Sequence, residues 1–295
     1  MSDSDPTQQL GTTGVWSAAL RYGDSTAAAE AATELESLGY GALWVPDVGG
    51  DLFGALENLL AATSTARIAT GILNLWMHTP EETAARYQEF VSGFGERLML
   101  GIGVSHAPLA NMLKEGQYQR PLARMSEYLD RLDEADPPVP LQHRMLAALG
   151  PKMLDLARDR TAGSHPYLVT PEHTARVRDA LGSSRLVAPE QAVVLETDSE
   201  RARFLARTHL AGYLNLPNYS NNWKRIGFTD DDLYDGGSNR LVDALVAWGD
   251  EEAILARVQQ HRDAGADHVC VQVLTEDLLI PATDELRRLA PALIS

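Results

Sequence analysis

The sequence is poor in cysteine and in basic residues, and each shortage excludes a class of protein. Cys270 is the single cysteine among 295 residues, which excludes an intrachain disulfide and a multi-cysteine zinc site. Lys and Arg total 25 against 41 Asp and Glu, giving a formal net charge of −16. A nucleic-acid backbone would meet a repulsive average field, so nucleic acid is not expected as a partner. A few backbone amides at a helix start can still hold an anionic small ligand.

Long hydrophobic runs are also missing. No apolar stretch approaches the roughly 20 residues that a membrane span needs. The polar start, MSDSDPTQQLGTTG, has neither the basic flank nor the apolar run of a signal peptide. These observations predict a cytoplasmic protein with no membrane partner. Cys270 lies in the apolar run DHVCVQVL, which favours a small buried side chain on a strand over a reactive thiol.

What the sequence does contain is a regular alternation of short apolar runs with amphipathic runs of helical period. This alternation is typical of repeated βα units and a parallel sheet. Hydrophobic residues make up 44% and charged residues 22% of the chain, the proportions of a globular protein with a sizeable core. The length suits one (β/α)8 TIM barrel of roughly 250 residues with an insertion. Two domains of ordinary size are the alternative.

Eight strands are predicted, each followed by helix. Ser25 is predicted to cap the first long helix, Gly39 to end it, and Pro80 to begin the helix after the third strand. The apolar runs that predict the strands are GVWSAAL, ALWVPD, ARIATGILNL, LMLGIGVS, HRMLAALG, SHPYLV, QAVVLETD and DHVCVQVL.

The α/β pattern is interrupted once, after the seventh strand and its helix. Residues 215–239 are polar, aromatic and rich in turn residues, and sustain neither a helix nor a strand period. A segment of this length inside a barrel is interpreted as a lid or binding insert. The run LVDALVAWG at 241–249 is predicted as a helix. The residues after the fourth strand, through HAPLANMLKEGQYQRP, are predicted as a long loop.

In a parallel barrel the active site forms at the carboxyl ends of the strands. No HxH or HExxH pattern occurs at these ends, so no metal site is predicted. The fourth run has GxG without a third glycine, which disfavours a GxGxxG dinucleotide site. The candidate site residues at the strand ends are Asp47, Asn74, Trp76, His78, Ser105, His106, Gly150, Ser164 and His165.

The third run, ARIATGILNLWMH, is unusual for a strand. Gly71 interrupts it and Asn74 is polar in its interior, neither of which core packing requires. Together with Gly101 and Gly103 in the fourth run, Gly71 offers bare main chain against which a flat ring can lie. For each glycine, accommodation of barrel packing is the alternative.

A second pattern follows the fifth and sixth runs. In LAALGPKMLDLA, Gly150 and Pro151 open a helix and Lys152 follows, while Ser164 and His165 stand at the end of the adjacent strand. Free amides at a helix start, a hydroxyl and nearby cations are the groups that hold a phosphate. An ordinary proline-led helix with a surface lysine is the alternative.

Taken together, these segments resemble the bacterial luciferase-like superfamily of flavin and deazaflavin oxidoreductases, in particular its coenzyme F420-dependent members of actinobacterial type. The resemblance implies a single luciferase-like TIM-barrel domain over 1–295 with an insertion at about 215–239. Members of the family often form dimers, so a homodimer is compatible with it. The segments that carry the resemblance are GYGALWVPD, IATGILNLWMHTPEETAA, GERLMLGIGVSH, LAALGPKMLDLARDRTAGSHPYLVTPEHT and DAGADHVCVQVL.

The resemblance also implies which residues form the site. The GILN sequence would form a bulge, with a cis peptide between Gly71 and Ile72, against the central ring of the cofactor. Asp47 would lie near the ring edge, although Val48 follows it where many deazaflavin members have a histidine. The cofactor-binding residues so implied are Gly71, Ile72, Asn74, Gly103, Val104, Ser105, Gly150, Lys152, Ser164 and His165.

The activity implied is hydride transfer between C5 of F420 and a small organic substrate, in either direction. His106 and Asp47 are the expected catalytic residues, and the ordinary pKa of histidine near 6.5 suits His106 to move the accompanying proton. Tyr219, Trp223 and Tyr234 of the insertion are expected to cover the substrate. Two alternatives stay open: an FMN-dependent monooxygenase working with a separate reductase, and a non-catalytic barrel that binds a flavin or a phosphate-bearing ligand.

Overall fold

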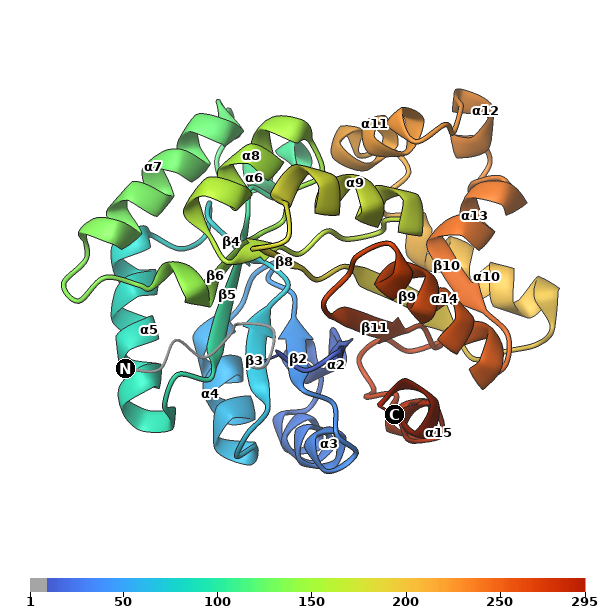
Figure 1. The fold of residues 1–295 in the computed structure, drawn as a ribbon, viewed down its shortest axis with the longest axis horizontal. Coiled ribbons are helices and arrows are strands. Elements are labelled where there is room, and N and C mark those ends of the chain that lie inside the picture. Colours follow the sequence, from blue (N-terminus) through green and yellow to red (C-terminus); the bar gives the residue numbers. More distant parts are fainter. Residues whose placement is uncertain (1–9, 295) are drawn as a thin grey trace.

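The strands of the computed structural model form a parallel β-barrel wrapped by helices (Figure 1). The structure describes residues 10–294, so most of the polar start lies outside the described residues. The strands are β1 (Thr13–Trp16), β2 (Ala42–Val45), β3 (Arg67–Thr70), β4 (Leu73–Asn74), β5 (Leu98–Gly103), β6 (Arg144–Leu146), β7 (Gly163–Ser164), β8 (Leu186–Val187), β9 (Glu190–Val194), β10 (Val246–Trp248) and β11 (Val269–Val273).

The helices follow the strands in turn and cover the outside of the barrel. They are α2 (Ala19–Tyr22), α3 (Ser25–Ser37), α4 (Leu52–Ala62), α5 (Pro80–Phe94), α6 (Ala107–Leu113), α7 (Pro121–Glu134), α8 (Pro151–Arg160), α9 (Pro171–Leu181), α10 (Ser199–Leu210), α11 (Pro217–Arg225), α12 (Asp230–Leu233), α13 (Asn239–Leu245), α14 (Glu251–Asp263) and α15 (Thr283–Leu293).

The barrel closes through one stretch of chain. The strands pair in the order β10-β9-β11-β1-β2-β3-β5-β6-β7-β8, with β4 pairing with β5. β8 pairs with β7 and β9 pairs with β11, and only Ala188 and Pro189 separate β8 from β9. The chain from β8 to β9 therefore connects the β7 side of the ladder with the β11 side, and β10 pairs with the other edge of β9. The predicted (β/α)8 architecture is confirmed, with its third strand divided into β3 and β4 and its seventh into β8 and β9.

Helix starts follow the predicted capping chemistry closely. Pro80 begins α5 as predicted, and the Thr79 hydroxyl accepts a hydrogen bond from the Glu82 amide. The cap of α3 is Asp24, whose carboxylate accepts from the Ala27 amide. The prediction that Ser25 caps this helix is therefore wrong by one residue.

Three segments differ from the predictions. The predicted loop after the fourth strand contains α6, and residues 215–239 contain α11 and α12. The helix predicted over 241–249 ends at Leu245, and Val246–Trp248 form β10 instead. The reason is tertiary: β7 is only two residues long and pairs with β8, which leaves the edge of β9 to be paired by β10.

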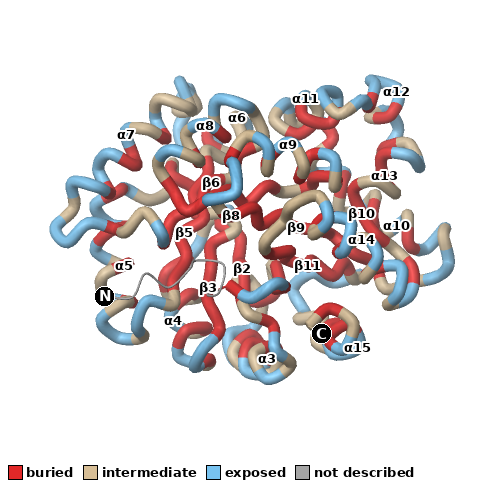
Figure 2. Tube along the Cα trace, viewed as in Figure 1, coloured by how far each residue is buried: buried red, intermediate tan, exposed pale blue. Residues whose placement is uncertain are grey.

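The core lies inside the barrel and between the barrel and its helices, and Figure 2 shows the strands buried and the outer turns of the helices exposed. Trp44 is fully buried in the barrel and stacks on His165, with 4.2 Å between ring centroids. Cys270 on β11 is fully buried, as predicted. Within the described residues, no helix combines the length and the apolar character needed to cross a membrane.

Candidate functional site

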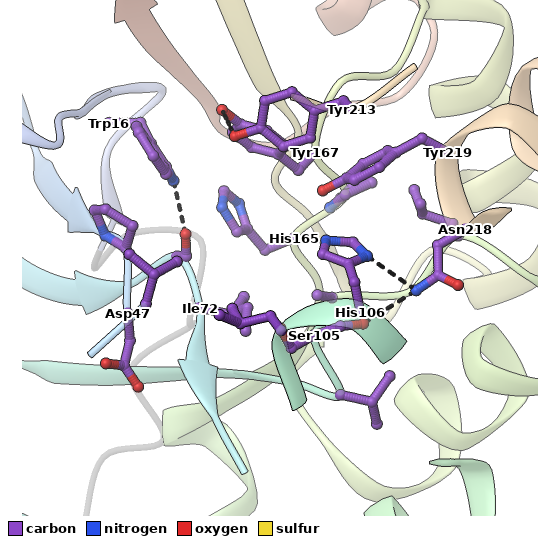
Figure 3. A pocket seen from close by; sticks show the side chains of 18 residues that line it. Trp16, Asp47, Ile72, Ser105, His106, His165, Tyr167, Tyr213, Asn218 and Tyr219 are labelled. Carbon is purple, nitrogen blue, oxygen red and sulfur yellow. Dashed lines mark hydrogen bonds between the residues drawn. The ribbon is translucent and has the colours of Figure 1, made fainter. Parts of the chain in front are cut away.

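A cavity of about 190 Å³ lies at the carboxyl ends of the barrel strands, where a parallel barrel places its active site (Figure 3). Its walls come from the last residue of β1, from the residues that follow β2, β3, β5, β6 and β7, and from the segment around α11. The lining residues are Trp16, Pro46, Asp47, Val48, Gly71, Ile72, Val104, Ser105, His106, Leu109, Ala147, Leu149, His165, Pro166, Tyr167, Tyr213, Asn218 and Tyr219.

The segment after β3 forms one wall. The peptide bond between Gly71 and Ile72 is cis, as the resemblance implies. The Gly71 amide donates to the Val45 carbonyl at 2.7 Å, and the Trp16 indole Nε1 donates to the Gly71 carbonyl at 2.9 Å. A Cβ atom on residue 71 would lie 2.6 Å from Trp16 Nε1. Glycine is therefore required here because Trp16 packs directly against the main chain.

Gly103 contributes space to the same wall. A Cβ atom on residue 103 would lie 2.6 Å from the Cδ1 atom of Ile72. The absence of a side chain at the end of β5 thus gives Ile72 its place beside the cavity. Gly103 is not itself among the lining residues, so its expected contact with a cofactor stays a prediction.

The Asp47 carboxylate is fully buried and already has partners. Its Oδ2 atom accepts from the Asn74 amide at 3.0 Å and contacts His78 Nε2 at 3.1 Å. Figure 3 shows the carboxylate directed away from the middle of the cavity. Burial lowers the pKa of His78, but the hydrogen bond and charge of Asp47, with those of Glu82, outweigh burial and leave the pKa raised. Asp47 therefore fixes the end of β4 and the His78 ring.

His165 places a buried acceptor at the cavity. Its Nδ1–H donates to the Ala188 carbonyl at 2.7 Å. Burial lowers the pKa of His165 to about 4, so the ring is neutral at pH 7 and Nε2 carries a lone pair. Nε2 is buried and has no hydrogen-bond partner within residues 10–294. Since buried polar atoms are nearly always satisfied in native proteins, this atom fits a ligand that donates a hydrogen bond.

His106 stands on the opposite side of the cavity, immediately before α6. The Asn218 amide Nδ2 donates to the Ser105 carbonyl at 3.1 Å and lies 3.3 Å from His106 Nδ1. Because an amide nitrogen only donates, Nδ1 is the acceptor, and the neutral ring carries its proton on Nε2. Burial lowers the pKa of His106, which favours the neutral ring. In Figure 3 the Nε2 side of the ring faces away from Asn218, towards the cavity.

The remaining wall is aromatic and uncharged. The Tyr167 hydroxyl donates to Gln272 Oε1 at 2.8 Å and lies 3.4 Å from the Tyr213 hydroxyl. Burial raises the pKa of Tyr167 well above its ordinary value. Beside this wall Glu190 is fully buried, and burial raises its pKa to about 8, so the carboxyl is mostly neutral at pH 7.

Several predicted site residues lie outside the lining. Asn74 is buried beside Asp47, and the Ser164 hydroxyl donates to the Leu146 carbonyl inside the barrel. Gly150 caps α8, and Lys152 is exposed in the first turn of that helix. A Cβ atom on Gly150 would lie 3.9 Å from Arg225 Nη1, so α11 brings a second cation to this helix start.

Of the three aromatic residues expected to cover the substrate, Tyr219 lines the cavity and the other two do not. Trp223 is fully buried and its indole donates to the Leu168 carbonyl at 3.0 Å, while Tyr234 is 80% exposed.

The sequence analysis missed four aromatic or polar residues of the lining, together with apolar ones such as Leu109. Trp16 and Tyr167 lie inside the runs GVWSAAL and SHPYLV that predict strands, whereas the strands end at Trp16 and Ser164, so predicted bounds that were too long hid both residues. Tyr213 follows α10 and Asn218 lies in the first turn of α11, and no local pattern marks them. Within the described chain, no group of three or more histidine, cysteine or acidic side chains is placed to hold a metal ion.

Solved structures of several enzymes share this fold. An F420-dependent secondary alcohol dehydrogenase, in complex with an F420–acetone adduct, is 15% identical, with 96% of this chain and 99% of that chain covered and a TM-score of 0.73. The F420-dependent tetrahydromethanopterin reductase of Methanopyrus kandleri is 14% identical, with 96% and 98% covered and a TM-score of 0.78. At these identities the likeness shows the fold alone.

An FMN-binding enzyme has the same fold. The oxygenating constituent of 3,6-diketocamphane monooxygenase from Pseudomonas putida, in complex with FMN, is 14% identical, with 97% of this chain and 98% of that chain covered and a TM-score of 0.66. No curated protein matches the sequence. The family model described as luciferase-like monooxygenase matches residues 9–268, most of the chain. The chain therefore belongs to the luciferase-like monooxygenase family of enzymes.

Proposed function

We propose that this enzyme is an F420-dependent oxidoreductase, which transfers a hydride between the deazaflavin C5 and an organic substrate. The observation that carries the proposal is the cavity between Ile72 and the aromatic wall, with the unpartnered His165 Nε2 atom beside it. Two enzymes with this fold are F420-dependent, and this is the ground for naming F420 first.

The residues at the cavity fit a flavin or deazaflavin ring. Such a ring has apolar faces and an N–H donor on its pyrimidine edge, and the cavity offers apolar Ile72 and the neutral acceptor Nε2 of His165. Trp16 and the Asp47–Asn74 hydrogen bond hold the Gly71–Ile72 segment on its two sides. When bound, the ring supplies the carbon that gives or takes the hydride.

His106 is the proposed catalytic residue on the substrate side. With Asn218 donating to Nδ1, the neutral ring presents Nε2–H to the cavity. A fixed donor there stabilises negative charge that develops on a substrate oxygen. This role suits the neutral ring better than full proton donation, because loss of the Nε2 proton would leave an imidazolate. The apolar walls exclude water from the reacting atoms.

The phosphate side of the cofactor is proposed to lie at the start of α8. The amides after Gly150, with the side chains of Lys152 and Arg225, form a positive helix start there. Ser164 is not part of this group, since its hydroxyl is buried and donates to Leu146.

FMN is the second candidate cofactor. It is favoured by the description of the family model as a monooxygenase and by the FMN complex of one enzyme with this fold. The two cofactors share a tricyclic ring and a phosphate, so His165 and the start of α8 suit both.

Direct binding tests the cofactor. The purified protein is titrated with F420 and, separately, with FMN, and binding is followed by the fluorescence of each ring. We expect micromolar or tighter binding of F420, and micromolar binding of FMN without F420 binding would refute the proposal. Hydride transfer from reduced F420 to a panel of carbonyl compounds and enones then separates an enzyme from a barrel that only binds the cofactor.

A further inference from the structure

Two hydrogen-bond donors without partners meet in the cavity, and they come from different elements. The Tyr219 hydroxyl, from α11, has no hydrogen bond to any described residue. Figure 3 shows this hydroxyl pointing to the middle of the cavity, between His106 and His165. The rings of Tyr219 and His106 lie 5.1 Å apart between centroids. His106 Nε2–H is the second donor. Because the two rings are in contact and both line the cavity, one acceptor atom in the cavity in front of them can bind both donors.

Asn218 fixes the direction of the second donor. Its Nδ2 atom is held by the Ser105 carbonyl at 3.1 Å and faces His106 Nδ1 at 3.3 Å. Turning the amide over would place its oxygen against the Ser105 carbonyl oxygen, which is unfavourable. The tautomer with the proton on Nε2 is therefore selected by α11, the same helix that supplies Tyr219.

The rest of the lining has no charge to offer a ligand. It includes no Lys or Arg, and its one carboxylate, Asp47, is occupied by Asn74 and His78. A charged ligand would lose its hydration without gaining a partner, which is costly in an apolar cavity. An uncharged ligand with one acceptor oxygen meets no such penalty.

We propose that Tyr219 and His106 form a binding site for the carbonyl oxygen of an uncharged, largely apolar substrate, with Asn218 as the positioning residue for His106. A carbonyl oxygen suits this site because it has two lone pairs and no hydrogen, and so accepts from both donors at once. The inference rests on the proposed function in one respect: the carbon bonded to this oxygen, or conjugated with it, would take the hydride as the C=O or C=C π bond breaks. The proton that the reduced cofactor also releases would then complete the alcohol or the saturated carbonyl compound, and the reverse reaction would return both to the cofactor.

Ligand binding tests the proposal without any reaction. Three probes of similar size are titrated into the full-length protein, with and without F420, by saturation-transfer NMR and calorimetry: cyclohexanone, methylenecyclohexane and cyclohexanecarboxylate. We expect cyclohexanone to bind most tightly. Tyr219→Phe removes one neutral hydrogen bond and should weaken cyclohexanone about 3- to 10-fold, with little change for methylenecyclohexane. Tyr234→Phe makes the same chemical change in the same insertion at a residue 80% exposed, and should change neither probe.

The positioning role of Asn218 has its own readout. Long-range ¹H–¹⁵N spectra of the imidazole rings report the tautomer of each histidine, and His106→Gln identifies the signals of His106. We expect the proton of His106 on Nε2 in the wild type and a mixture of tautomers in Asn218→Leu. A wild-type ring with its proton on Nδ1 would overturn the role of Asn218.

The remaining outcomes separate the substrate site from the cofactor. Equal binding of cyclohexanone and methylenecyclohexane, absence of cyclohexanone binding, or an undiminished preference in Tyr219→Phe would each overturn the carbonyl site. Weaker F420 binding in Tyr219→Phe, with cyclohexanone unchanged, would assign the two donors to the cofactor and overturn it too. Failure of F420 to bind, with the cyclohexanone preference intact, would remove the proposed function and leave the oxygen site standing.

Discussion

The Trp16 indole Nε1 donates a hydrogen bond of 2.9 Å to the Gly71 carbonyl, and so joins the end of β1 to the segment after β3. Both residues line the cavity. The contact is close because residue 71 has no side chain, and a Cβ atom there would lie 2.6 Å from the same nitrogen. One hydrogen bond thus determines the shape of the wall on which cofactor binding is proposed to depend.

Replacing Trp16 with Phe is expected to loosen that wall. The Gly71 carbonyl loses its donor and a cavity opens, so the free energy of unfolding should fall by about 2–3 kcal/mol, measured by urea denaturation. F420 affinity should fall as well. Trp248→Phe is the control, since the Trp248 indole donates to Asp243 at 2.8 Å outside the cavity lining. An equal loss of F420 affinity in both variants would contradict the local role of Trp16.

Replacing Gly103 with Ala is expected to push Ile72 from its place. The added Cβ atom would lie 2.6 Å from Ile72 Cδ1, and overpacking of this kind costs about 1–3 kcal/mol of stability. Ile72→Ala removes the clashing atoms. The double variant should therefore lose less unfolding free energy than the sum of the losses in the two single variants. Additive losses, measured by denaturation of all four proteins, would show that the two residues do not compete for this space.

The His78–Asp47 contact should make stability depend on pH in a defined direction. Burial alone lowers the pKa of His78, but Asp47 and Glu82 outweigh it, so the pKa of the folded state is raised. His78 then binds its proton more tightly in the folded protein than in the unfolded chain. This contribution is complete below the ordinary pKa of about 6.5 and is lost as the pH rises through the folded-state pKa.

His78→Gln tests that direction. The difference in unfolding free energy between the wild type and this variant should be largest near pH 6 and should shrink towards pH 9. Chemical denaturation across this range gives the difference directly. A gap that stays constant with pH would show that His78 is neutral throughout and acts only through packing and a neutral hydrogen bond.

Lys152→Ala and Arg225→Ala are expected to weaken F420 binding about 2- to 5-fold each, since exposed charges contribute modestly. The loss should be specific for the phosphate, so the phosphate-free deazaflavin riboside should bind all variants equally. Lys224→Ala serves as the control, because Lys224 pairs with Asp230 instead. An equal loss of affinity for F420 and for the riboside would show that the phosphate does not bind at the start of α8.

Cys270 should be inert in the native protein. It is fully buried, and burial raises the pKa of its thiol well above the ordinary value. An aromatic disulfide reagent is expected to react with it only as fast as the protein unfolds, and at once in denaturant. Reaction at the rate of a free thiol would indicate a channel to β11.

The sequence predicts most of the barrel because barrel units carry local signals. Pro80 suits a helix start, and the apolar runs predict the strands that form the ring. The run QAVVLETD predicted β9, whereas β8, which lies before Pro189 and pairs with β7, was not predicted. The residues of β10 were wrongly predicted as helix, because the sequence is apolar on both sides of Leu245. Only the pairing with β9 makes Val246–Trp248 a strand.

The candidate site likewise contains residues that the sequence marks and residues that only tertiary contacts place. Gly71 and Gly103 stand out in the sequence because a glycine inside a strand needs a reason, and the structure gives it in the closeness of Trp16 and Ile72. Asp47 was expected at the cavity, but only its neighbours Asn74 and His78 decide where its carboxylate points. The unpartnered Tyr219 hydroxyl has no counterpart in the sequence pattern.

By itself, therefore, the sequence determined the alternation of strands and helices, the glycines at the strand ends and the family resemblance, because each is written in neighbouring residues. Tertiary structure alone decided that Asn218 faces His106, that Tyr219 points into the cavity and that Arg225 approaches Gly150. Asn218 and His106 are separated by 112 residues. A contact between such distant residues depends on how the barrel closes and where the insertion packs, which no local pattern encodes.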